Sequence, residues 1–178
     1  WDESGGAIWK MRADGQGEPL RLTTAPALWI DPVWSPDGSA VVALTAPLRS
    51  TLQAPPGGFP TDLQLSLIPA AGGAGRLVAT AQGMRRPHFV GGDGSRVWLS
   101  AASDLISIEL QTGDQRVEAR VAAGTAPGSE MRANPSGTQI ALRSGRRLIT
   151  VPLAINAPLP RQVDVVQGIW NLRDVFKV

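Results

Sequence analysis

The chain has 178 residues, of which 43% are hydrophobic and 18% charged, and its formal net charge is +2. This composition excludes a disordered polymer and allows one domain with a sizeable core. Because there is no cysteine, no apolar run of roughly 20 residues and no cationic stripe, we expect no disulfide, thiolate metal site, membrane span or nucleic-acid partner.

The first predicted element is a hairpin with strands at residues 7–15 and 20–23, joined through Gln16 and Gly17. The chain opens at Trp1 within strand-like sequence and has no initiator methionine. We interpret it as a mature product, a fragment or an excised domain. The missing signal peptide therefore indicates nothing about the compartment.

A second kind of hairpin is predicted at residues 31–45, where Asp37 and Gly38 tolerate the positive φ that a tight turn requires. Pro32, and Pro87 in the next hairpin of this kind, are expected near the start of the first strand, where a missing backbone donor is least harmful. Residues 46–61 contain several prolines and two glycines, and we expect a loop there. A further hairpin of the first kind follows at residues 62–69 and 76–79.

The same two hairpins recur twice more along the chain. The pairs occupy residues 86–100 with 104–121, and residues 130–143 with 147–166. Their predicted turn glycines are Gly94, which follows Asp93, and Gly137. The final residues, 168–178, lack the Pro-Asp-Gly turn, although they could begin another strand.

This strict alternation predicts an all-β fold, a partial β-propeller of four-stranded antiparallel blades. Gly94 and Gly137 lie 43 residues apart, which matches the roughly 40–45 residues of one blade. A β-sandwich would also give short strands, but not this alternation of hairpins. We expect about three and a half blades: a half-blade at 1–29, blades at 30–85, 86–129 and 130–167, and a tail at 168–178.

Three and a half blades of this size do not close a ring, and an open ring leaves strand edges exposed to another chain. We therefore expect the functional molecule to include more polypeptide, from further blades of the same chain or from a partner.

Two runs resemble the repeat of TolB-type propellers. They are Trp-Ser-Pro-Asp-Gly at residues 34–38, in the inner hairpin, and Ile-Trp-Lys-Met-Arg-Ala-Asp-Gly at residues 8–15, in the outer hairpin. The likeness extends over almost the whole chain. It is specific for the fold, but the same blades serve several functions.

Residues 96–153 look like the propeller that precedes the metal-dependent barrel in secreted bacterial amidohydrolases. This resemblance implies a periplasmic or secreted setting and a non-catalytic binding or scaffolding module attached to a hydrolase domain. The catalytic metal ligands would then lie elsewhere in the polypeptide. Two alternatives stay open: a stand-alone TolB-like envelope interaction protein, and the substrate-gating propeller of a prolyl-oligopeptidase-like serine peptidase.

The sequence contains no recognisable catalytic, cofactor or metal centre. His88 is the single histidine, whereas a zinc site needs several converging ligands. No Gly-x-Ser-x-Gly elbow is present, and no alternating acidic loop suggests calcium. We expect His88 in an inner strand, hydrogen-bonded near one mouth of the channel, with Asp31 and Glu130 at the starts of inner strands near a mouth.

In a propeller, the loops between blades and the loops between a blade's two hairpins lie on one face. Aromatic and arginine residues on such loops are common materials of a binding surface, although an ordinary solvated rim would have the same composition. The candidate binding face comprises Trp29, Asp31, Arg49, Phe59, Arg85, Arg86, His88, Glu130 and Arg132.

Overall fold

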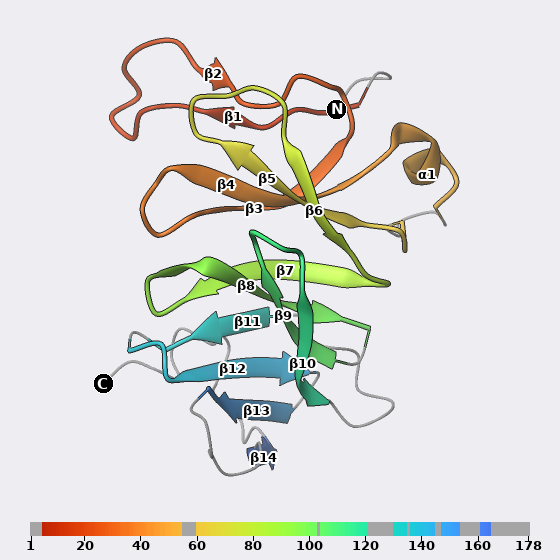
Figure 1. The fold of residues 1–178 in the computed structure, drawn as a ribbon, viewed down its shortest axis with the longest axis vertical. Helices are drawn as coiled ribbons and strands as arrows, with labels where there is room; N and C mark the ends of the chain where they lie inside the picture. Colours follow the sequence, from red (N-terminus) through yellow and green to blue (C-terminus); the bar gives the residue numbers. More distant parts are fainter. Residues whose placement is uncertain are drawn as a thin grey trace.

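The computed structural model describes residues 5–54, 60–102, 104–120, 130–134, 136–144, 147–153 and 161–164. These residues form three four-stranded antiparallel sheets and one two-stranded sheet. The sheets follow one another in chain order along the long axis of the molecule (Figure 1). The prediction of an all-β, partial propeller of four-stranded antiparallel blades is confirmed.

Each sheet takes its strands from one continuous stretch of sequence, and within each sheet neighbouring strands are consecutive in the chain. The half-blade contains β1 (Trp9–Lys10) and β2 (Leu20–Arg21). Blade 1 contains β3 (Leu28–Trp34), β4 (Ala40–Ala46), β5 (Gln64–Pro69) and β6 (Arg76–Thr80). Blade 2 contains β7 (Met84–Val90), β8 (Asp93–Ala101), β9 (Asp104–Glu109) and β10 (Gln115–Arg120). Blade 3 contains β11 (Glu130–Ala133), β12 (Gln139–Ser144), β13 (Arg147–Pro152) and β14 (Arg161–Asp164).

The hydrophobic core lies between successive blades. Blade 1 contributes Val42, Leu44 and Leu65 to a cluster with Leu99 and Ile108 of blade 2, all completely buried. Separate clusters join the half-blade to blade 1 and blade 2 to blade 3. Apolar burial at about 25 cal/mol per Å² therefore stabilises the contacts between sheets as well as each sheet.

The Trp-Ser-Pro-Asp-Gly turn of blade 1 is held by its own side chains. The Ser35 hydroxyl donates to the Asp37 carboxylate at 2.6 Å, and the backbone N–H of Ser39 donates to the same oxygen at 3.1 Å. These bonds, with the Ser35 hydroxyl contributing most, lower the pKa of Asp37 to about 2. In blade 3 the Asn134 side chain holds the equivalent turn, because it accepts the backbone N–H groups of Thr138 and Gln139 at 2.9 Å.

The predicted turn of blade 2 at Asp93 and Gly94 is wrong. The hairpin turns instead at Gly91 and Gly92, with φ values of 66° and 77°, and Asp93 already pairs with Val90 in β8. A two-residue turn with both φ values positive matches the twist of the flanking strands. Two adjacent glycines adopt it at less steric cost than Asp-Gly.

The loop expected at residues 46–61 is wrong in part. Ala46 belongs to β4, and α1 (Leu48–Leu52) forms a single helical turn within the predicted loop. The Ser50 hydroxyl donates to the Asp62 carboxylate at 2.7 Å, which fixes α1 to the start of the outer hairpin. Among the described residues no helix is long and apolar enough to cross a bilayer.

The inner turns of blades 2 and 3 approach each other at Gly91 and Gly137. A Cβ on Gly137 would lie 2.4 Å from the Gly91 Cα, whereas a Cβ on Gly38 would meet nothing within 4 Å. Both Gly137 and Gly38 have φ near 70°. The two positions thus share the same backbone conformation and differ in the contact between blades.

We predict that Gly137→Ala destabilises the fold more than Gly38→Ala does. Both substitutions incur the roughly 1–2 kcal/mol penalty of a left-handed alanine, but Gly137→Ala adds about 1–3 kcal/mol of overpacking between blades. Urea unfolding of the two variants measures the difference. An equal decrease in the free energy of unfolding for the two variants would show that blades 2 and 3 can move apart at this point without loss of stability.

Candidate functional site

A cavity of about 170 Å³ lies among the inner strands β3, β7 and β11, which are the first strands of the three blades. We call it the inner-strand cavity. β7 packs against β3 on one side and β11 on the other, so all three blades contribute to the site. It is lined by Asp31, Pro32, Val33, Arg86, Pro87, His88, Met131 and Arg132.

Two neighbouring inner strands carry the same backbone irregularity at this cavity. Asp31 and Arg86 have positive φ values of 51° and 53°, and each is followed by proline. The pairing of β3 shifts between Ile30 and Val33, and that of β7 shifts after Arg85. Each strand therefore contains a bulge, a feature that redirects side chains and is frequent beside functional sites.

The sequence predicts Pro32 and Pro87 near the starts of their strands, and this prediction is wrong. Both lie in the middle of seven-residue strands, at the bulges. A proline lacks a backbone donor, so the bulge is the place within a strand where it disrupts the ladder least. A non-glycine residue at positive φ costs about 1–3 kcal/mol, and this strain occurs twice, at the wall of one cavity.

Asp31 connects blade 1 to blade 2. Its carboxylate accepts the backbone N–H of Arg86 at 3.1 Å. The same carboxylate acts on Arg85: burial lowers the pKa of the Arg85 guanidinium, and the negative charge of Asp31 partly offsets that effect. The Asp31 carboxylate is therefore already engaged by neighbouring groups.

His88 lies in the inner strand β7, as predicted, and is half-buried. Burial lowers the pKa of its imidazole, and the positive charge of Arg132 lowers it further. His88 and Arg132 come from adjacent blades, so the blade arrangement brings them into electrostatic contact.

The structure brings Asp31, Arg86, His88 and Arg132 together and distributes the other predicted residues elsewhere. Trp29 belongs to β3 and packs against the apolar cluster between the half-blade and blade 1. Arg49 is exposed on α1. Arg85 lies in β7 beside the cavity, Glu130 begins β11, and Phe59 lies outside the described residues.

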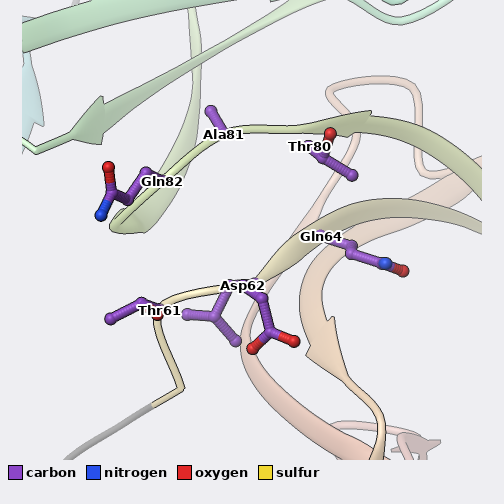
Figure 2. Close-up of a pocket in the computed structure, with 7 residues that line it drawn as sticks. Thr61, Asp62, Gln64, Thr80, Ala81 and Gln82 are labelled. Carbon is purple, nitrogen blue, oxygen red and sulfur yellow. The ribbon is translucent and has the colours of Figure 1, made fainter. Parts of the chain in front are cut away.

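A second cavity, of about 480 Å³, lies at the open end of the outer hairpin of blade 1, opposite the turn that joins β5 to β6 (Figure 2). β5 and β6 pair at Gln64 and Thr80, and the chain segments before and after them meet again where the Gly83 N–H donates to the Thr61 carbonyl at 3.2 Å. Neutral hydroxyl and amide side chains and the Asp62 carboxylate surround the space between. It is lined by Thr61, Asp62, Leu63, Gln64, Thr80, Ala81 and Gln82.

No sequence pattern indicates this second cavity. The polar residues at the end of one strand and the start of another looked like ordinary loop residues, and only the pairing of β5 with β6 brings them together. Across the described ranges, no three histidine, aspartate or glutamate side chains gather in a way that could hold a metal ion.

No protein-family model matches the chain, and no curated protein matches its sequence. Solved structures do match its fold. A puromycin-hydrolysing peptidase of Mycobacterium tuberculosis superposes with a TM-score of 0.59 at 18% identity, over 91% of this chain and 27% of that one. TolB from Acinetobacter baumannii superposes with a TM-score of 0.57 at 14% identity, over 83% and 37%.

An oligogalacturonate lyase in complex with manganese superposes with a TM-score of 0.54 at 14% identity, over 92% of this chain and 42% of that one. The chain thus spans less than half the length of each of these three proteins. At such identities the likeness establishes a TolB-like propeller fold and carries no activity to this chain.

We predict that Arg132→Gln raises the pKa of His88 toward its ordinary value. The substitution removes the positive charge that disfavours the imidazolium and leaves the burial of the ring in place. Because His88 is the single histidine, a proton NMR titration reports it without overlap. An unchanged pKa in Arg132→Gln would show that the two side chains do not interact.

We also predict that the fold loses stability in mild acid because of His88. The pKa of an unfolded histidine is about 6.5, and the folded value is lower. Below about pH 6.5 the unfolded chain binds a proton that the folded chain resists, so stability falls as the pH falls through this window.

Urea unfolding between about pH 7.5 and 5.5 measures this dependence, and His88→Gln should flatten it. Equal pH slopes for the two proteins would assign the acid sensitivity to other groups.

Proposed function

We propose that the chain is a non-catalytic TolB-like propeller module that binds or scaffolds another protein, and that it serves as the propeller part of a periplasmic or secreted metal-dependent amidohydrolase. The half-blade, the three blades and the tail would together form part of a larger propeller. The observation that carries the binding role is the repeated strain at Asp31 and Arg86 beside one cavity. Such strain persists only where the surrounding structure holds it in place, and it clusters at active and ligand-binding sites.

The charged composition of the inner-strand cavity also supports binding. Asp31, Arg86, His88 and Arg132 come from three blades and line one space. Charged and polar groups held by a rigid scaffold give an interface its specificity and orientation more than its raw affinity.

The half-blade supports the presence of further polypeptide. Ile8 and Leu22 are buried against blade 1, whereas Trp9 and Met11 are 57% and 65% exposed. Because side chains alternate along a strand, Trp9 lies on the face of β1 opposite Ile8. Another blade packed on that face would cover the indole as the other blades cover their apolar faces. The two-stranded sheet is at the N-terminal end of the stack (Figure 1).

A second candidate function is the substrate-gating propeller of a serine peptidase, which is favoured by the likeness to the puromycin-hydrolysing peptidase. A third is a stand-alone interaction protein of the envelope, which is favoured by the likeness to TolB. The gene sequence following residue 178 distinguishes them. A His-x-His strand end supports the amidohydrolase, a Gly-x-Ser-x-Gly elbow supports the peptidase, and neither supports the interaction protein.

We predict that a charge reversal in the inner-strand cavity abolishes partner capture. Arg86 is exposed and lines the cavity, so Arg86→Glu changes its charge without emptying the core. Pull-down from a periplasmic extract should recover a partner with the wild-type chain and not with Arg86→Glu. Arg116→Glu, an equal change on the exposed outer strand β10, should retain the partner.

Circular dichroism of both variants checks that the fold is intact. Loss of the partner in both variants would indicate nonspecific charge effects and contradict the proposed site. Metal-independent hydrolysis by this chain, abolished by His88→Gln, would overturn the non-catalytic role.

A further inference from the structure

The inner-strand cavity has an excess of positive charge. Of its described lining side chains, Arg86 and Arg132 are permanently cationic, His88 can become so, and Asp31 is the one carboxylate. Arg85 lies next to Arg86 in β7 and is also near Asp31. The ion pairs of Arg12 with Asp14 and of Arg96 with Glu109 lie outside this cavity.

The carboxylate of Asp31 interacts with two groups of blade 2. It accepts the Arg86 backbone N–H at 3.1 Å and attracts Arg85. On the blade 3 side, by contrast, His88 faces the positive charge of Arg132, and that charge disfavours the imidazolium. A cationic pocket therefore lies between blades 2 and 3, where an added anion would gain favourable interactions with two groups.

The dimensions of the cavity select a small group. Its volume is about 170 Å³, below the roughly 300–1,000 Å³ of pockets that enclose a whole small molecule or cofactor, and a water molecule occupies about 30 Å³. The end of one side chain fits, with a few waters. Val33 and Met131 supply apolar wall for methylene groups, and a planar carboxylate matches the fork of an arginine guanidinium.

We propose that the inner-strand cavity receives a carboxylate side chain presented by the protein partner, held between Arg132, Arg86 and His88. The inference rests on the proposed binding function and specifies the chemistry that is recognised: an acidic residue in an exposed segment of the partner. An arginine guanidinium pairs with carboxylate and phosphate alike, but the apolar wall of Val33 and Met131 would pack against the methylene groups of an acidic side chain, which a free phosphate lacks.

The test uses His88 as an internal probe on the full chain. Acetyl-Gly-Glu-Gly-amide is titrated at constant ionic strength while proton NMR follows the pKa of His88. A bound carboxylate stabilises the imidazolium, so the peptide should raise this pKa saturably, by about half a pH unit or more, which corresponds to about threefold tighter binding to the protonated form. Acetyl-Gly-Gln-Gly-amide, which has the same shape and no charge, should leave the pKa unchanged.

Two variants locate the effect. In Arg132→Gln the Glu peptide should no longer raise the pKa of His88, and in Arg116→Gln, which changes an exposed arginine on the outer strand, it should raise it as in the wild type. Either result reversed would overturn the proposal, as would equal shifts with the Glu and Gln peptides or no shift with either. A larger shift with inorganic phosphate than with the Glu peptide would also overturn it, in favour of a phosphate site.

The peptide titration and the pull-down test the two proposals separately. Arg86-dependent capture without a peptide-induced shift contradicts the carboxylate proposal and leaves the binding function standing. A peptide-induced shift without Arg86-dependent capture supports the carboxylate site and contradicts the proposed role in partner binding.

Discussion

The whole structure depends on sheets that bury apolar side chains on both faces. In β4, Val42 and Leu44 pack toward blade 2, while Val41 and Ala43 pack toward the half-blade, and none is more than 3% exposed. A sheet of this kind cannot be stable alone, because at least one apolar face would meet water. Stacking successive sheets removes that cost, as in other repeat architectures.

Anchoring by both faces explains why the inner strands can hold irregular backbone. The apolar contacts of blades 1 and 2 fix β3 and β7 on either side of their bulges, so the local strain at Asp31 and Arg86 is supported by a much larger burial of surface. The cavity is thus a product of the packing between blades. Its charged residues lie close together because equivalent positions of consecutive inner strands share one wall.

Turn chemistry made much of this fold predictable from the sequence. Asp37 and Asn134 each bind the backbone of their own turn, a local effect that sequence reveals. The position of the turn in blade 2 was not predictable, since Gly91-Gly92 and Asp93-Gly94 can both adopt a tight turn. Only the register in which β7 pairs with β8 decides between the two positions. The proximity of His88 to Arg132 also depends on how the blades align, which no local pattern encodes.

The contact between Gly91 and Gly137 has a geometric consequence for the assembled molecule. With no side chain between them, the inner turns of blades 2 and 3 come nearly into backbone contact. In an array of repeats, the rotation per repeat determines the overall curvature. The absence of a side chain at both positions therefore lets the two turns approach, and the closeness of this approach contributes to the rotation from blade 2 to blade 3.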